Sequence, residues 1–179
     1  MNKIIYVLLS YTLIFTVQCN SKNQDNIKLL IEPLKDNPQA DNIEIKIIFF
    51  NNSKKEIDIY CWQKKTISHA INNFLKFNIT DINCDTSEFI YHYKSPQVLL
   101  PYENDFITIS PKESYEEVIT LNKYYILKSK KDMGNERSWG IGMFEIKCYY
   151  QYIHDSEYKY GNNLWEGKIS SNKITINVK

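Results

Sequence analysis

The chain is poor in the residues that nucleotide-binding and nucleic-acid-binding proteins depend on. Its 179 residues include one arginine, Arg137, and five glycines, all in the last third. Lys and Arg number 22 against 21 Asp and Glu, which gives a formal net charge of only +1. Without arginine forks or a basic excess, no nucleic-acid partner is expected. Without early glycines, the phosphate loop of a nucleotide-binding α/β fold is excluded.

Alanine is also scarce, with only Ala40 and Ala70, whereas Ile, Tyr, Phe, Thr and Val are abundant. This balance disfavours helices and favours strands. Apolar and polar residues alternate in most segments, with turn residues between them, which predicts an all-β antiparallel sandwich. The predicted strands are residues 27–31, 43–47, 57–61, 75–79, 89–93, 106–109, 115–121, 144–152 and 173–178. Residues 64–73 and 128–140 do not alternate and are predicted to be long loops.

The N-terminus has the pattern of a secretory leader. A short positive head at Lys3 is followed by an apolar run over residues 4–17, which is too short for a permanent membrane span. The run ends at Thr16-Val17-Gln18-Cys19, which is similar to the lipobox of bacterial lipoproteins. We therefore expect residues 1–19 to be a lipoprotein-type signal peptide with lipidation at Cys19. Residues 20–26 form a flexible tether, and residues 27–179 form one domain.

Lipidation of Cys19 would leave three cysteines, Cys61, Cys84 and Cys148, so at most one disulfide is expected within the chain. Cys61 and Cys148 fall on the apolar parity of their predicted strands. If these two strands are neighbours in one sheet, as their order along the chain suggests, the cysteines can form a disulfide, which an oxidising envelope allows. Two buried thiols are an equal alternative. Cys84 is expected in a turn as the third thiol. No cysteine has zinc-site spacing, so no metal or other cofactor is expected.

No motif in the chain predicts catalysis. His69, His92 and His154 lie in different predicted segments, and no serine or cysteine stands in a recognisable nucleophile motif. The neighbouring carboxylates Glu116 and Glu117 would point to opposite faces of a strand. We therefore predict that the protein is not an enzyme.

The segment 128–140 is the main candidate contact surface on the sequence. It combines basic residues, the only arginine and a tryptophan in a stretch too long for a simple turn, and binding groups are often carried on such loops. The candidate contact residues are Lys130, Lys131, Arg137 and Trp139. Among the fourteen tyrosines, Tyr150 and Tyr152 are predicted to point into the core.

Residues 27–152 together resemble a known family. The matching segments are residues 45–52 with 55–61, the hairpin 77–93, residues 107–114, 118–125 and 142–146, and the tail 164–172. They resemble the immunoglobulin-like sandwich that forms the propeptide-like N-terminal domain of deuterolysin-type metalloendopeptidases and that also occurs in stand-alone bacterial envelope proteins. Where such domains usually carry Pro-Gly-Glu, this chain has Pro111-Lys112-Glu113. The His-Glu-x-x-His motif of the peptidase domain is absent from the sequence.

These observations predict a non-catalytic lipoprotein of the cell envelope, with an immunoglobulin-like antiparallel β-sandwich that binds a protein or has a structural role. It would face the periplasm or lie at the outer membrane through its lipid anchor, or be secreted if the lipobox is not used. The resemblance implies an alternative, in which the domain is an inhibitor or propeptide-like partner of a metalloendopeptidase.

Overall fold

The computed structural model describes residues 26–61, 74–82, 87–91, 105–129, 136–137, 139–153 and 163–179. Several predictions fall outside these residues and stay predictions. They concern the leader, the tether before Asn26, Cys19, Cys84, the three histidines, Lys130 and Lys131.

The described residues are mostly in strands, and all the strands are paired antiparallel. The strands are β1 (Ile27–Pro33), β2 (Glu44–Asn51), β3 (Ile57–Tyr60), β4 (Leu75–Asp81), β5 (Ser87–Tyr91), β6 (Phe106–Ile109), β7 (Ser114–Thr120), β8 (Tyr125–Ser129), β9 (Glu136–Arg137), β10 (Gly142–Tyr152) and β11 (Gly167–Val178). One short 3-10 helix, η4 (Leu121–Lys123), follows β7.

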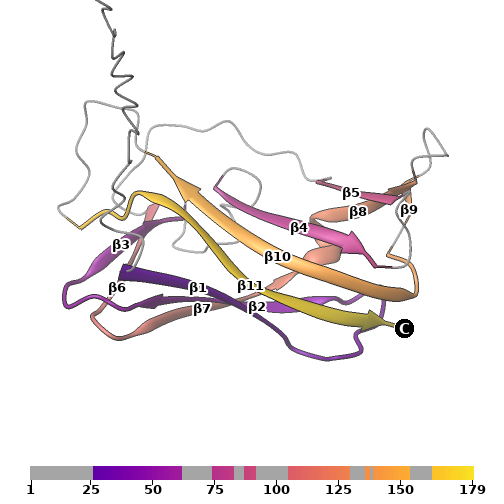
Figure 1. Ribbon diagram of the computed structural model, residues 1–179, viewed down its shortest axis with the longest axis horizontal. Helices are drawn as coiled ribbons and strands as arrows, with labels where there is room; N and C mark the ends of the chain where they lie inside the picture. Colours follow the sequence, from indigo (N-terminus) through magenta and orange to yellow (C-terminus); the bar gives the residue numbers. More distant parts are fainter. Residues whose placement is uncertain are drawn as a thin grey trace, which may run out of the picture.

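Two three-stranded sheets form the layers of a sandwich (Figure 1). One has the order β1-β2-β7 and the other β11-β10-β4. These orders correspond to strands A, B and E and to strands G, F and C of an immunoglobulin-like domain. The pair β3-β6 and the small sheet β5-β8-β9 extend this frame. The predicted all-β immunoglobulin-like sandwich is thereby confirmed.

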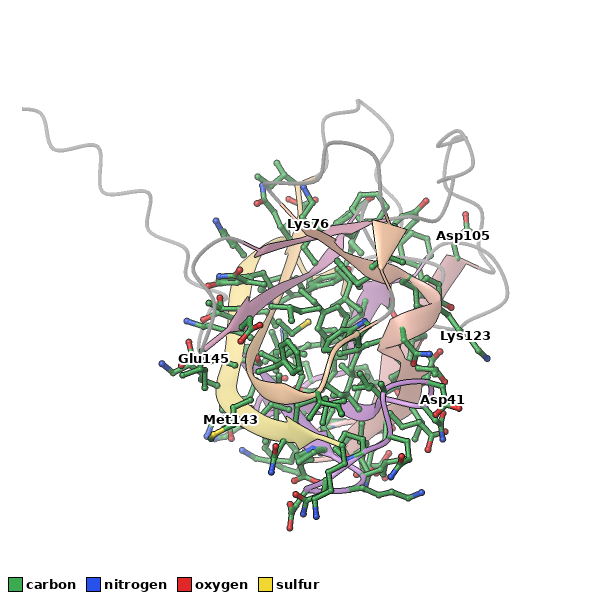
Figure 2. All side chains as sticks on the ribbon, turned by 90° about the vertical axis from the view of Figure 1, so that its right-hand side faces the viewer. Asp41, Lys76, Asp105, Lys123, Met143 and Glu145 are labelled. Carbon is green, nitrogen blue, oxygen red and sulfur yellow. The ribbon has the colours of Figure 1, made fainter. Side chains whose placement is uncertain are left out.

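The core lies between the layers and is filled by the inward parity of each strand (Figure 2). In β10 every second side chain from Phe144 to Tyr152 is buried, as the alternation predicts. Tyr150 and Tyr152 both point inward, which confirms their predicted placement. The described core residues lie between Ile27 and Val178.

Two turns at one end of the sandwich are held together by Asn51, whose side chain is fully buried. Its Nδ2 donates to the carbonyl oxygens of Lys55 and Ile109, at 2.8 Å each, and its Oδ1 accepts from the backbone N–H of Ser53 at 2.9 Å. The Asn51 backbone also bonds Lys112 and Glu113. The turn between β2 and β3 and the turn between β6 and β7 therefore form one hydrogen-bonded unit.

The second of these turns keeps a backbone geometry that usually needs glycine. Lys112 has φ +65°, and the N–H of Glu113 donates to the carbonyl of Ser110 at 3.1 Å. This is the pattern of a type II turn, with Pro111 at its second position and a positive φ at its third. The Lys112 ammonium donates to the backbone and side-chain oxygens of Asn52, at 2.6 and 3.0 Å. These bonds help to hold lysine in a backbone conformation that favours glycine.

Candidate functional site

Of the two alternatives that the sequence left open for Cys61 and Cys148, the structure has two buried thiols. A disulfide would need the strand ending at Cys61 to lie beside β10. Instead β3 pairs with β6, and the neighbour of β10 is β4. The Cys61 thiol donates to the carbonyl of Asp105 at 3.1 Å. Burial raises the pKa of Cys148 well above its ordinary value, against the lowering effect of a backbone hydrogen bond from Tyr149, so this thiol is inert at neutral pH.

Trp139, one of the four candidate contact residues, belongs to the core and not to a contact surface. Its side chain is only 2% exposed and its ring packs edge-on against Phe144, with centroids 5.2 Å apart. The indole N–H donates to the carbonyl of Tyr125 at 2.9 Å. The segment around it is also not simply a loop, because Arg137 lies in β9, which pairs with β8. The side chain of Arg137 is outside the described residues.

The described residues contain no group of three or more His, Cys, Asp or Glu side chains that could hold a metal ion. Within the same part of the chain, no helix is long and apolar enough to cross a membrane. The surfaces that remain as candidates are the outer faces of the two sheets.

The outer face of the β4-β10-β11 sheet presents an ordered grid of polar side chains. Antiparallel register places Tyr149 between Lys76 and Ser170, and in the next row Gln151 lies between Phe74 and Lys168. These side chains are the outward parity of strands whose inward parity fills the core. The grid is therefore fixed by the same pairing that builds the sandwich.

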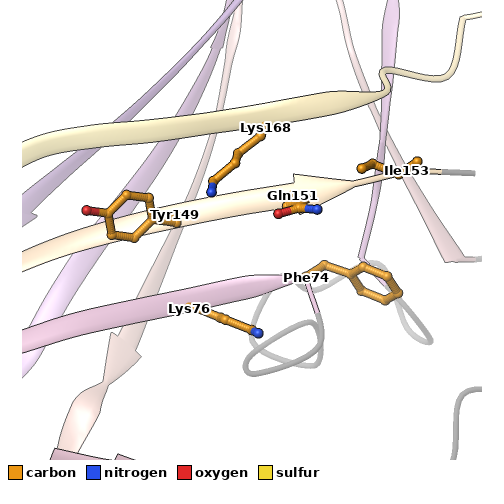
Figure 3. Close-up of a pocket in the computed structure, with 6 residues that line it drawn as sticks. All are labelled: Phe74, Lys76, Tyr149, Gln151, Ile153 and Lys168. Atoms are coloured by element: carbon orange, nitrogen blue, oxygen red, sulfur yellow. The ribbon is translucent and has the colours of Figure 1, made fainter.

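A shallow groove of about 510 Å³ lies on this grid (Figure 3). Its volume is in the range of small-ligand and peptide side-chain sites. Aromatic rings, an amide and two ammonium groups line it, with Ile153 as an exposed apolar side chain at one end, 66% accessible. The lining residues are Phe74, Lys76, Tyr149, Gln151, Ile153 and Lys168.

The floor of the groove is anchored from beneath by an aromatic cluster. The ring of Phe74 meets Tyr60 edge-on at 4.8 Å and Tyr152 at 5.5 Å. Tyr150, next on the inward side, donates its hydroxyl to the carbonyl of Tyr60 at 2.8 Å. Packing of this kind fixes the rotamers beneath the groove, so the surface is preorganised for binding.

The two outer faces of the sandwich carry opposite charge. Among the residues on the outward parity of β4, β10 and β11, four lysines stand against one carboxylate, Glu145, which leaves a balance of +3. The lysines are Lys76, Lys147, Lys168 and Lys173. On the β1-β2-β7 face, two lysines stand against three glutamates, a balance of −1; these are Lys28, Lys46, Glu32, Glu44 and Glu116.

Local contacts shape the positive face without neutralising it. Glu145 forms an ion pair with Lys173 at 2.7 Å, which both side chains make while partly exposed. The Lys147 ammonium lies 5.2 Å from the centroid of the Tyr149 ring, within the range of a cation–π contact. Lys76, on the neighbouring strand β4, adds a further positive charge next to Tyr149. A small overall net charge thus conceals a positive surface.

Sequence reasoning missed this face, although part of the signal was present. Alternation in residues 144–152 already places Lys147, Tyr149 and Gln151 outward. It does not say which strands lie on either side, and the contributions of Lys76 and Lys168 depend on that pairing.

Comparison with known proteins finds no matching family model and no matching curated protein. Functional reasoning therefore rests on the residues of this chain.

Proposed function

We propose that the protein is a non-catalytic lipoprotein of the cell envelope, and that its sandwich domain is a protein-binding module. The lipid would be attached at Cys19, and residues 20–26 would link it to the folded domain. The module would bind an acidic surface of a partner protein through the outer face of the β4-β10-β11 sheet.

The observation that carries the binding proposal is the contrast between the two outer faces. A balance of +3 around an aromatic groove favours a negatively charged partner, whereas the opposite face, at −1, does not. Aromatic side chains provide contact area at low entropic cost, and lysines around them speed association with an acidic surface. The resemblance to domains of stand-alone envelope proteins supports the same reading.

Substitution of Cys19 with serine is expected to release the full chain from the membrane fraction, because the acyl chains that hold it there would no longer be attached. The measurement is fractionation of expressing bacteria, with a radiolabelled fatty acid to detect lipid on the wild type. A matched control is Cys148→Ser, which changes a buried thiol outside the leader. Retention of the Cys19→Ser chain in the membrane would contradict the lipoprotein proposal.

The double charge reversal Lys76→Glu with Lys147→Glu is expected to weaken partner capture at least tenfold, because it removes two attractive charges and adds two repulsive ones. Capture from the envelope fraction of the native cell, quantified by mass spectrometry, would measure this. The matched control is Lys46→Glu with Lys35→Glu, two lysines that lie outside the positive face.

Two results of that capture would revise the proposal. Equal losses in both double variants would remove the positive face as the binding site. Capture of a metalloendopeptidase, together with slowing of its activity by a stoichiometric amount of the domain, would replace the general binding role with the inhibitor role.

A further inference from the structure

We propose that the two joined turns at one end of the sandwich form a basic end that lies against anionic lipid headgroups of the membrane carrying the anchor. The basic end consists of the turn over residues 51–55, the turn over residues 110–113 and the first residues of β1. This inference rests on the proposed lipid attachment at Cys19, and it adds an orientation of the domain at the membrane surface.

The tether meets the folded domain at the basic end. The carbonyl of Asn26, the residue before β1, accepts a hydrogen bond from the N–H of Asn52 at 2.8 Å. Asn52 is part of the same turn as Lys54 and Lys55, both of which are exposed. The last tether residue is therefore bonded directly to the turn that carries these lysines.

The tether is short enough to keep the basic end near a lipid on Cys19. Seven residues, 20–26, follow Cys19. Fully extended they span at most about 25 Å, and a flexible chain of this length has a typical end-to-end distance of about 15 Å. A lipid on Cys19 would thus hold the basic end, and not the far end of the sandwich, next to the headgroups. Electrostatic attraction over a Debye length of about 8 Å then acts on a surface already close by.

The basic end carries exposed lysines on a rigid turn. Four lysines, Lys28, Lys54, Lys55 and Lys112, are exposed at this end, against two exposed glutamates, Glu113 in the second turn and Glu56 directly after the first. The buried side chain of Asn51 and the hydroxyl of Ser53, which bonds both the carbonyl and the N–H of Lys55, fix the turn. The lysines are therefore presented from a preformed surface.

The opposite end of the sandwich lacks this excess among the described residues. Lys35, Lys123 and Lys179 are exposed there, but they stand among the carboxylates of Asp36, Asp41 and Asp81. Lys179 lies beside this segment because its N–H donates to the carbonyl of Pro38. These three lysines give a matched control for the basic end, since they allow the same number of charge reversals at the other end.

The test uses residues 19–179 carrying Cys19→Ser, so that any membrane binding comes from the folded domain and not from a lipid. Sedimentation with vesicles of phosphatidylethanolamine and about one third phosphatidylglycerol measures the affinity, with phosphatidylcholine vesicles for comparison. We expect binding to the anionic vesicles only, weakening steeply from about 0.05 to about 0.5 M salt. The triple variant Lys28→Glu, Lys54→Glu, Lys55→Glu should bind at least about 100-fold more weakly, from about fivefold per lysine.

The control variant Lys35→Glu, Lys123→Glu, Lys179→Glu should bind within about threefold of the unreversed chain, since its charges lie far from the surface. Three results would each contradict the proposed contact of the basic end with anionic lipid. They are equal losses of affinity in the two triple variants, equal binding to neutral and anionic vesicles, and no vesicle binding. Competition by inorganic phosphate at constant ionic strength would also overturn it, in favour of a discrete phosphate site. A loss of vesicle binding confined to the double variant Lys76→Glu with Lys147→Glu would contradict the basic end and assign membrane contact to the outer face of the β4-β10-β11 sheet.

This test is independent of the proposed anchor. Absence of vesicle binding would remove the orientation and leave the lipoprotein proposal intact if Cys19→Ser releases the full chain in cells. Vesicle binding by the basic end together with membrane retention of the full-length Cys19→Ser chain would instead remove the anchor, and with it the tether argument.

Discussion

Replacing Asn51 with alanine is expected to lower the free energy of unfolding by about 3 kcal/mol, because three hydrogen bonds made by one buried side chain are lost together. The bond to the carbonyl of Ile109 is buried, so no water replaces the lost donor without penetrating the core. For a domain of this size the midpoint of thermal unfolding should fall by about 6 to 12 °C. Calorimetry or chemical denaturation measures the change.

Two further substitutions test whether the loss of stability is specific to the side-chain hydrogen bonds of Asn51. Asn52→Ala removes an exposed acceptor of the Lys112 ammonium and should cost less than about 0.5 kcal/mol. Asn51→Asp keeps the acceptor for Ser53 but turns a carboxylate oxygen toward two carbonyl oxygens, and should cost at least as much as alanine. A loss below about 1 kcal/mol for Asn51→Ala would contradict the role of Asn51 as the link between the turns.

The fold was predictable because its strands alternate strictly. In β2 the pattern Glu44–Asn51 places Ile45, Ile47 and Phe49 inward, and all three are fully buried. One-sided burial of this kind can only be satisfied by a second layer, so alternation predicts a sandwich as well as strands. The same physics assigned Tyr150 and Tyr152 to the core.

Strand pairing was not predictable, because alternation fixes the faces of a strand but not its neighbours. The sequence suggested that the strand ending at Cys61 pairs with the strand of Cys148. In the structure that place belongs to β4, so the two strands that a Cys61–Cys148 disulfide would join are not neighbours. The positive face depends on the same pairing, which is why its lysines could not be grouped from the sequence.

The first half of β11 was missed because a polar residue, Ser171, occupies one of its buried positions. Ser171 is buried, and its hydroxyl accepts from the N–H of Cys148 at 2.8 Å where the β10-β11 register shifts. Asn172 bonds both the N–H and the carbonyl of Ile31, at 2.8 and 3.0 Å, and so links β11 to β1. Hydrophobic periodicity starts only beyond this point, where the strand was predicted.

Trp139 was missed for the opposite reason, since a large aromatic residue in a segment without periodicity was assigned to a contact surface. The tryptophan closes one end of the core over Phe144, and its N–H has a buried carbonyl partner. A segment without alternation can therefore supply a core residue.

Alkaline pH is expected to destabilise the domain steeply, because two buried acids keep their protons in the folded state. Burial, the largest cause in each case, raises the pKa of Cys148 well above 9.0 and that of Tyr150 well above 10.0. The unfolded chain releases these protons at its ordinary pKa values, whereas the folded chain retains them. Stability is thus fully present below pH 9.0 and falls as the pH rises above it, by up to about 1.4 kcal/mol per pH unit for each group.

Comparison with Cys148→Val isolates the contribution of the thiol, because valine fills a similar volume and does not titrate. Measured under reducing conditions, the variant should lie within about 1.5 kcal/mol of the wild type at pH 8. Its stability relative to the wild type should then rise by up to about 1.4 kcal/mol per pH unit above pH 9. Ile146→Val on the same strand removes a buried methylene and should show a difference that does not change with pH. A parallel decline of the wild type and Cys148→Val from pH 8 to pH 11 would mean that the thiol ionises in the folded state, and that the core around β10 admits water at high pH.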